Sequence, residues 1–402
     1  MMSSVLKVTK KNNCLESYKQ AIKFHQQQLR IAQKCGNRRG EVASLNNLGL
    51  AFHFLGQYQE AIDYYGQSLQ IEREIGDRAG EAKSWSNLGK TYHSLGQYQQ
   101  ALKFYQHSLA IRRELGDRVD IATSLNRLGK ACCSLRQYER AIDYYGQSLA
   151  IKRELGHRSG QIKSLMGLGM AYHFLGRYQQ AIEAFQQSLV IAREIGDHAG
   201  EVTALDYLGH VARSLGQYQQ AIDYYGKSLV IKREVGVSVK RDALPALLPI
   251  SSKRSPALRE ALPPKVRECN SYSTADRDSG CIIKAQARPS LGATRLNSVL
   301  RSEIVTSLNN LGKAYCSLEQ YQQAIDCYGQ SLLIAQEIGV SKAGRDKSLR
   351  QMEATLLGNL GDAYRALGQY QQAIEFHQQS LLIKRELGDR AGTAVSLNKL
   401  GK

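Results

Sequence analysis

The stretch EAKSWSNLGKTYHSLGQYQQALKFYQHSLAIRRELGDRVD, from Glu81 to Asp120, is repeated, interrupted or cut short along the rest of the chain. Its tripeptide Gly96-Gln97-Tyr98 returns at steps of 40 residues, as Gly56-Gln57-Tyr58, Gly176-Arg177-Tyr178 and Gly216-Gln217-Tyr218. Arg136-Gln137-Tyr138 fills the place between them. A fixed period of this size is typical of proteins built from stacked repeats, so we expect an elongated array without one central core.

Each repeat is predicted to contain two helices. In the first half, apolar residues at helical spacing form one stripe, namely Trp85, Leu88, Gly89, Tyr92 and Leu95. The second half carries another stripe, Tyr98, Ala101, Leu102, Tyr105, Leu109 and Ile111. Gly96 and Gly116 stand where left-handed C-cap residues are expected, and Asp117 is a suitable N-cap. Because neither helix can bury its stripe alone, the units must stack, and we expect Trp85 to be buried between helices.

These residues resemble the signature of the tetratricopeptide repeat. Trp85-x2-Leu88-Gly89-x2-Tyr92, followed by Ala101-x3-Tyr105, is similar to W-x2-L-G-x2-Y…A-x3-F. The usual period is about 34 residues and the usual ending is Pro. The longer repeat ending in Gly-Asp-Arg resembles the Partner-of-Inscuteable type and bacterial multi-repeat scaffolds. The resemblance implies an all-α fold, a right-handed superhelical α-solenoid of antiparallel helix pairs.

The repeat pattern divides the chain into four segments. Residues 1–15 are an N-terminal tail, and residues 16–236 hold an unpaired second helix and five helix pairs, which start near Glu41, Glu81, Asp120, Gln161 and Glu201. The pattern is lost over 237–303 and returns over 304–402 as two pairs and a truncated first helix. This makes sixteen helices with an unpaired helix at each end. The last half-repeat has no polar capping face, so we expect it to fray, to associate with another copy, or to mark a fragment.

The segment 237–303 interrupts the array. It contains all six prolines, and Val237 to Ser302 holds twelve Lys or Arg and five Asp or Glu. A short helix is expected at Leu258 to Leu262, and Thr294 to Ser302 is expected to extend the following first helix. The remainder is predicted to be a flexible, dispensable insertion. It is either a basic docking loop or a tolerated insertion without a role, and we favour the second interpretation. Closing a long loop adds little entropy cost, so the stack is expected to run past it.

Charge and composition narrow the class of protein. The formal net charge is +18, which suits an acidic partner such as an acidic peptide, nucleic acid or an anionic membrane, and equally suits simple solubility. No apolar stretch of signal-peptide or membrane-spanning type is present, so we expect a cytoplasmic protein without a membrane partner. The eight cysteines form no C-x-x-C pair, and Cys132 is expected to be a small core residue.

Catalytic and metal-binding patterns are missing from the sequence. It has no Gly-rich phosphate loop, no G-x-S-x-G and no H-E-x-x-H, so we predict a protein that is not an enzyme and that needs no cofactor. His53, His93 and His173 recur at one repeat position. Equivalent residues in successive repeats are separated by about 8–10 Å, whereas zinc ligands lie about 2 Å from one ion. A row of histidines along a groove is therefore favoured over a metal site.

The candidate site is the polar face of the first helices. In tetratricopeptide arrays these helices line the concave side, and their residues off the packing stripe meet the ligand. Asn47, Asn87, Asn310 and Asn359 share one position, whose amide both donates to and accepts from a peptide backbone. Lys90, Lys130, Lys313 and Lys402 form a cationic row one turn later. The predicted peptide-binding residues are Asn46, Asn47, His53, Lys83, Asn87, Lys90, His93, Asn126, Lys130, His173, Arg213, Asn309, Asn310, Lys313, Asn359 and Arg365.

The sequence therefore predicts a scaffold that holds a peptide segment of another protein, acidic in character, in its concave groove. A helical-repeat nucleic-acid binder is the first alternative, because the charge fits it. Such a binder stacks bases on aromatic side chains, and this face has few of them, namely Phe54, Phe174 and Tyr207. A sensor array separated from an effector domain is the second alternative. The partner itself cannot be identified from these residues.

Overall fold

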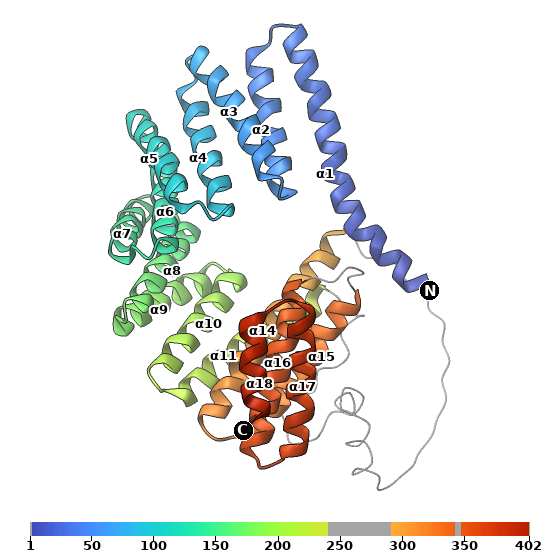
Figure 1. The fold of residues 1–402 in the computed structure, drawn as a ribbon. Helices are drawn as coiled ribbons and strands as arrows, with labels where there is room; N and C mark the ends of the chain where they lie inside the picture. Colours follow the sequence, from blue (N-terminus) through green and yellow to red (C-terminus); the bar gives the residue numbers. More distant parts are fainter. Residues whose placement is uncertain (1, 240–290, 342–346, 402) are drawn as a thin grey trace. The chain divides into compact units, whose positions relative to one another are not determined.

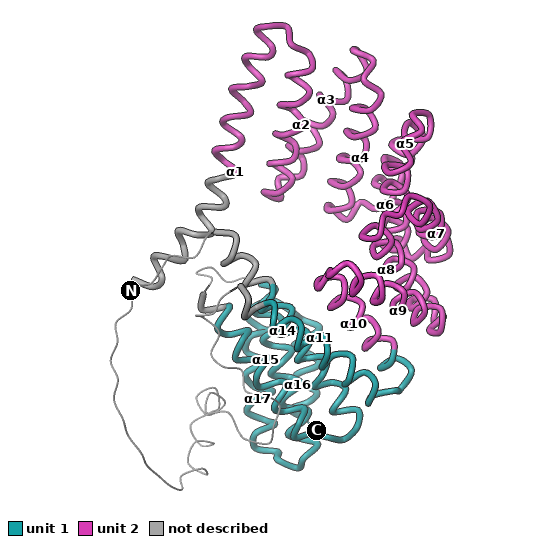
Figure 2. Tube along the Cα trace, turned by 180° about the vertical axis from the view of Figure 1, so that it is seen from behind, with its two compact units in different colours: residues 1–8, 212–402 teal, residues 9–211 magenta. Residues whose placement is uncertain are grey.

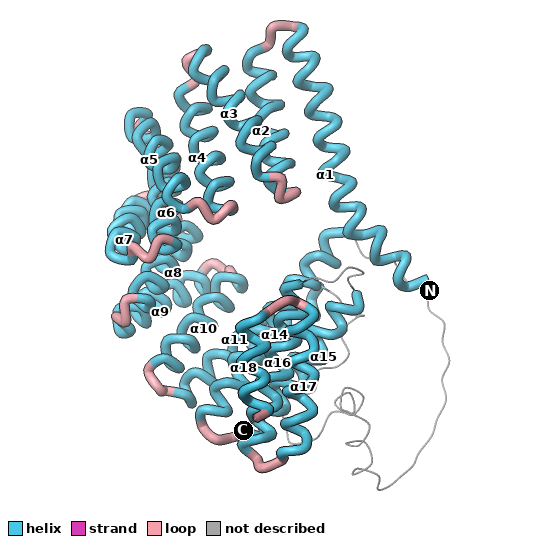
Figure 3. The backbone as a smooth tube through the Cα atoms, viewed as in Figure 1, coloured by secondary structure: helices cyan, strands magenta, loops and turns pink. Residues whose placement is uncertain are grey.

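The structure is a computed structural model that describes residues 2–239, 291–341 and 347–401. The expected short helix at Leu258 to Leu262 and most of the predicted insertion lie outside these residues. The described residues form sixteen helices and no strand (Figure 1, Figure 3). They fall into two compact units, unit 2 of residues 9–211 and unit 1 of residues 1–8 and 212–402 (Figure 2). Each unit is a run of helices packed on their sequence neighbours, so the fold is an all-α solenoid.

Unit 2 contains most of α1 and four complete helix pairs. Its helices are α1 (Met2–Lys34), α2 (Arg38–Phe54), α3 (Tyr58–Glu74), α4 (Arg78–Ser94), α5 (Tyr98–Leu115), α6 (Arg118–Ser134), α7 (Tyr138–Glu154), α8 (Arg158–Phe174), α9 (Tyr178–Glu194) and α10 (His198–Ser214). The boundary between the units falls within α10, after Val211. Since α1 begins at Met2, residues 2–15 of the expected tail are helical and continuous with the first half-repeat.

Unit 1 contains the repeats that follow. Its helices are α11 (Tyr218–Val239), α14 (Leu291–Ser317), α15 (Tyr321–Ser341), α16 (Lys347–Ala366), α17 (Tyr370–Glu386) and α18 (Arg390–Leu400). Leu229 of α11 lies in one buried cluster with Ile304 and Leu308 of α14, so the stack continues past the missing repeat pattern as predicted. α14 starts before Thr294, in agreement with the expected backward extension. α11 continues through Gly236, where the repeat pattern predicted its end.

A glycine of the first helix faces a ring of the second helix at the centre of several repeats. A Cβ atom added to Gly89 would lie 2.7 Å from the ring of Tyr105, and one added to Gly169 would lie 2.4 Å from the ring of Phe185. Tyr105 and Phe185 are buried, at the later aromatic position of the signature. The glycine therefore lets the second helix approach the first closely enough for its aromatic ring to fill the space between them.

Helix ends follow the chemistry that the sequence predicts. The side chain of Asp117 accepts a hydrogen bond from the backbone N–H of Asp120 (3.0 Å), which caps α6. Gly96 and Gly116 have φ of 77° and 72°, the left-handed conformation expected after a helix. Arg136 occupies the same place after α6 and also has a positive φ, 59°, which strains an L-residue with a Cβ atom.

Replacing Arg136 by Gly is expected to raise the free energy of unfolding by about 0.5–1 kcal/mol. The substitution removes a left-handed strain of about 1–2 kcal/mol, and part of the gain is lost to the greater entropy of Gly in the unfolded chain. The measurement is a shift of the urea midpoint at unchanged m-value. The reverse change at the equivalent turn, Gly176→Ala, serves as the control and should lower the midpoint; a fall for both variants would contradict the strain at Arg136.

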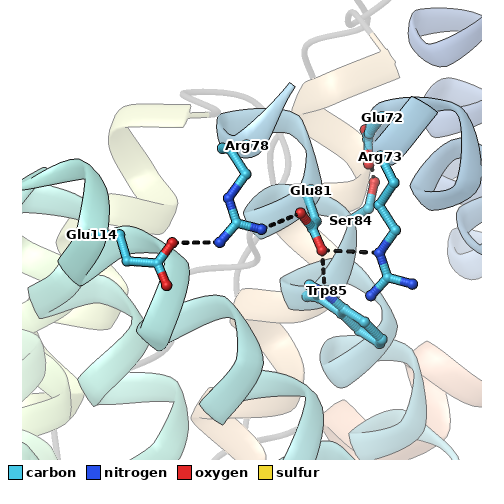
Figure 4. A network of polar contacts seen from close by, with 7 residues as sticks. All are labelled: Glu72, Arg73, Arg78, Glu81, Ser84, Trp85 and Glu114. Carbon is cyan, nitrogen blue, oxygen red and sulfur yellow. Dashed lines mark hydrogen bonds and ion pairs between the residues drawn. The ribbon is translucent and has the colours of Figure 1, made fainter. Parts of the chain in front are cut away.

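Ion pairs join the first helix to the end of the second helix in several repeats. The pairs are separated by 36 residues and include Arg38–Glu74, Arg78–Glu114, Arg118–Glu154 and Arg350–Glu386. Figure 4 shows how Arg78 also pairs with Glu81, whose other oxygen accepts from Arg73 Nε (3.0 Å). In the four pairs that are 36 residues apart the side chains are 37–61% exposed, so each of these pairs contributes about 0–1 kcal/mol to stability.

Trp85 is only half-buried, which corrects the expectation that it lies fully between helices. Its Nε1 donates to Glu81 Oε1 (3.4 Å), and the Arg73 guanidinium lies 5.2 Å from the ring centre (Figure 4). One face of the ring stacks near Phe104, with ring centres 5.3 Å apart. The equivalent residues Leu45 and Leu125 are 2% and 1% exposed, so the indole is too large for the space that a leucine fills at this position.

Candidate peptide-binding surface

In unit 2, the first helix of each repeat from α2 to α6 contacts the first helix of the next repeat. His53 Nδ1 of α2 lies 3.1 Å from Thr91 Oγ1 of α4, and His93 Nε2 lies 3.1 Å from Ser134 Oγ of α6. Ser164 Oγ of α8 donates to Asn126 Oδ1 of α6 (2.9 Å). α2, α4, α6 and α8 therefore form one surface of adjacent helices, which we call the first-helix face.

The surface residues of the first-helix face carry positive charge. Lys83, Lys90 and Lys130 are exposed, as is Lys163, and Arg127 is half-buried. The acidic residues of these helices lie in or near their first turns, where Glu41 and Glu81 pair with arginines. The exposed part of the face is consequently a cationic surface, and it attracts anionic groups.

Two asparagines accompany the lysines. Asn47 is exposed on α2, and Asn87 is half-buried at the same place on α4, one turn before Lys90. A primary amide offers a donor and an acceptor together, the combination that a peptide backbone requires. The position is filled by Arg127 in α6 and by buried Gly167 in α8, so the asparagine row stops after two helices.

The recurrent histidines pack against tyrosines. The rings of His53, His93 and His173 lie 5.4, 5.0 and 5.6 Å from the tyrosine that begins the next helix. Burial, and then the charge of Lys90, lowers the pKa of His53; burial and Lys130 do the same for His93. A lowered pKa favours the neutral form of His53 and His93. All three rings serve as packing groups. Among the described residues no group of three or more His, Cys, Asp or Glu is placed to hold a metal ion.

Asn46 and Asn310 correct the predicted set. Both are 8% exposed. Asn46 Nδ2 donates to Ser68 Oγ (2.8 Å) and Glu72 Oε1 (3.1 Å), where α2, α3 and α4 meet. A first helix in a stack is covered by its own second helix and also by the next repeat. Its buried stripe is therefore wider than the stripe predicted from the periodicity of that helix alone. These two amides are consequently part of the packing and are left out of the proposed surface.

The remaining predicted binding residues are either half-buried in unit 2 or lie in unit 1, outside the first-helix face. Asn126 of unit 2 is half-buried and already accepts from Ser164. In unit 1, Asn359 Nδ2 donates to Asn309 Oδ1 (2.8 Å), and Arg365 is exposed 3.9 Å from Asp362. Arg213 and Lys313 are half-buried, and the pKa of Lys313 is lowered by burial and by Arg213. Lys402 lies outside the described residues.

Sequence reasoning named Phe54 and Phe174 only as exceptions on a polar face. In the structure they are 53% and 57% exposed, at the ends of α2 and α8. Lys90 Nζ lies 5.7 Å from the ring centre of Phe54, within cation–π range. A comparison of one repeat position along the four first helices could have singled out these two residues. That position is occupied by Phe54, Ser94, Ser134 and Phe174.

The last half-repeat exposes apolar surface. Leu397 of α18 is 47% exposed, whereas the equivalent Leu45 and Leu308 are 2% and 0% exposed. A depression of about 380 Å³ beside it is lined by Arg385, Gly388, Arg390, Thr393, Ala394 and Leu397. Association of two copies through α18 stays a prediction.

The family assignment follows from the repeats themselves. A tetratricopeptide repeat model matches residues 13–74, 80–154, 161–234 and 351–402, and a second tetratricopeptide repeat model matches residues 304–338. The chain belongs to the tetratricopeptide repeat family, whose fold supports a role as a protein-interaction scaffold. No curated protein matches the chain.

Three solved structures are similar to this chain. BtubC (BKLC) from P. vanneervenii is 20% identical, with a TM-score of 0.51, over 59% of this chain and 98% of that one. A putative kinesin light chain from Podospora anserina with nearly identical repeats is 21% identical, with a TM-score of 0.43, over 48% and 96%. A Rap protein complexed with Competence and Sporulation Factor is 13% identical, with a TM-score of 0.48, over 99% and 97%. The likeness to BtubC is one of fold alone. Within the described ranges no helix is long and apolar enough to cross a membrane.

Proposed function

We propose that the chain is a non-catalytic scaffold that binds an acidic peptide segment of a partner protein on its first-helix face. The observation that carries the proposal is the cationic surface of α4 and α6, where Lys90 and Lys130 are exposed on adjacent helices. Asn87 lies one turn before Lys90, and Asn47 occupies the same place on α2, so both amides are available to pair with a peptide backbone. Charge complementarity of this kind speeds capture and selects acidic partners over basic ones.

The two kinds of residue are assigned different tasks. The lysines attract the ligand from a distance, and this attraction weakens as salt screens it. The asparagines orient the bound backbone at close range. An amide that loses its water without gaining a partner costs about 1–3 kcal/mol, so a ligand must satisfy it. A peptide in the cytoplasm is the expected ligand, and a nucleic acid is the alternative to be excluded.

The test measures binding of a fluorescein-labelled, Glu-rich 16-residue peptide by fluorescence anisotropy. The variant Lys90→Ala/Lys130→Ala is expected to weaken binding about tenfold at low salt and less as the salt concentration rises, because screening removes its advantage. Asn87→Ala is expected to weaken binding to a similar degree at every salt concentration, because its contact is short-ranged.

The matched control is Lys23→Ala/Lys103→Ala, which removes two exposed lysines from second helices and should leave the affinity unchanged. Circular dichroism must show that all variants retain their helix content. Equal losses for both lysine pairs would contradict a local surface. Tighter binding of a single-stranded oligonucleotide, with a linear log–log dependence of affinity on salt, would favour nucleic acid instead.

A further inference from the structure

Two aromatic clusters of the same composition lie at the two ends of the first-helix face. The first consists of Tyr18, His53 and Phe54, and the second of Tyr138, His173 and Phe174. Tyr18 and Phe54 stack with ring centres 5.8 Å apart and planes at 21°, and Tyr138 and Phe174 stack at 5.4 Å and 17°. Each histidine ring then lies 5.9 or 5.7 Å from its phenylalanine.

In both clusters the phenylalanine ring is exposed to solvent, while the tyrosine and histidine rings pack against it. Phe54 and Phe174 are more than half exposed, although each is packed between a tyrosine and a histidine. A ring held in this way loses little conformational freedom on binding, and rigid aromatic side chains of this kind dominate binding energy in protein interfaces. The two intervening first helices carry serine at the same position, Ser94 and Ser134, so the exposed ring is specific to the ends of the face.

The space between the clusters has the opposite character. It contains Lys90 and Lys130, both exposed, and the half-buried Arg127. Lys90 also lies over the ring of Phe54, which joins the first cluster to the cationic stretch. Along the stack, the surface therefore consists of an apolar cluster around Phe54, a cationic stretch and a second apolar cluster around Phe174.

The spacing of the clusters fixes the length of a matching ligand. Helices in direct contact lie about 8–10 Å apart, so the three steps from α2 to α8 span roughly 24–30 Å. An extended peptide advances about 3.3 Å per residue. Roughly seven to nine residues then separate the two side chains that reach the clusters.

We propose that the first-helix face recognises an extended acidic segment of a partner protein that carries an aromatic residue at each end, about eight residues apart. One residue packs on Phe54, the other on Phe174, and the acidic residues between them face Lys90 and Lys130. The inference rests on the proposed function and adds to it a spacing rule. Its occupant is chosen by charge complementarity with the intervening lysines and by the apolar character of the two clusters.

The experiment uses the whole chain and three labelled 16-residue peptides of equal charge. One has two Phe eight residues apart in a Glu/Ser background, one has two Phe two residues apart, and one has a single Phe. The first peptide is expected to bind about tenfold more tightly than either of the others, because only it engages both clusters. Equal affinities for the three peptides would overturn the spacing rule.

The protein variants are Phe54→Ser and Phe174→Ser, which install the residue that the intervening repeats already carry. Each is expected to weaken the widely spaced peptide about tenfold and to bring its affinity to that of the single-Phe peptide. Val190→Ser is the matched control, since Val190 is 54% exposed on a second helix. It should leave the affinity for the widely spaced peptide unchanged.

The outcomes separate the inference from the proposed function. Binding that responds to Lys90→Ala/Lys130→Ala but is indifferent to both phenylalanine variants would overturn the spacing rule and leave the acidic-peptide surface intact. If none of the acidic peptides binds, the proposed function fails and the inference fails with it. Loss of binding with Val190→Ser as large as with Phe54→Ser would assign the effect to general surface hydrophobicity and would also overturn the inference.

Discussion

Gly169→Val is expected to lower the free energy of unfolding by about 3 kcal/mol, because the new side chain overpacks the centre of a repeat. A Cβ at this position would lie 2.4 Å from a ring carbon of Phe185, a distance that forces one helix away from the other. Phe185 is 0% exposed and cannot swing into solvent without opening the repeat. Urea denaturation followed by circular dichroism measures the change in midpoint.

A matched control separates packing from helix propensity. Gly146 also lies inside a helix, but a Cβ added there meets no atom within 4 Å. Gly146→Val is expected to stay within about 0.5 kcal/mol of the wild-type protein, because valine is no worse than glycine in a helix where nothing obstructs it. Equal destabilisation by the two variants would assign the effect to backbone propensity and contradict the packing explanation.

A second substitution tests the contact directly. Phe185→Ala alone should cost about 3–5 kcal/mol, since it leaves a cavity in the repeat. In Gly169→Val/Phe185→Ala the valine enters the space that the ring has left. The combined loss should therefore be smaller than the sum of the single losses by about 1 kcal/mol or more. Strict additivity would show that residues 169 and 185 do not press on each other.

Lys152→Met is expected to raise the free energy of unfolding at pH 7 by about 1–3 kcal/mol, because it removes a charge that the repeat stack buries. Lys152 is 6% exposed, and its Nζ donates to Ser164 Oγ (3.0 Å) at the contact between α7 and α8. Among the described residues no carboxylate lies within ion-pair distance of this ammonium group. Burial, assisted by the charge of Lys163, lowers the pKa of Lys152 from 10.5 to about 8.

The lowered pKa gives this prediction a pH dependence with a defined sign. Above pH 8 the folded protein releases the Lys152 proton, while the unfolded chain keeps it until about pH 10.5. Since the unfolded state then binds more protons, the wild-type protein gains stability from this group as pH rises from about 8 to 10.5. The advantage of Lys152→Met should accordingly be largest at pH 7 and should shrink towards pH 10.

Denaturant midpoints of both proteins at pH 7, 8, 9 and 10 test this sign. Lys103→Met removes an exposed lysine from a second helix and is the control; its difference from wild type should be small and flat with pH. A constant advantage for Lys152→Met across the range would mean that Lys152 has an ordinary pKa and that burial does not penalise its charge. A loss of stability at pH 7 would show that the bond to Ser164 outweighs the cost of burial.

Much of the fold could be predicted because it depends on contacts within one repeat. The two apolar stripes, the left-handed glycines and the Asp117 cap are all local features, and the structure confirms them. The buried Cys132 was likewise found by its place in the stripe, and it is 0% exposed. The sequence by itself thus determined the helices of the described residues, their pairing and the repeat family.

Contacts between repeats were decided only by the tertiary structure. Asn46 is polar and sits beside the stripe, yet it is buried because α3 and α4 cover it and Glu72 pairs with it. Trp85 is apolar and sits on the stripe, yet it is only half-buried because the space there fits leucine. Helical periodicity gives the direction of a side chain from its own helix, but burial depends on how neighbouring helices close over it. The same reason explains why Phe54 and Phe174 are held exposed by Tyr18 and Tyr138, residues from helices that no local pattern connects to them.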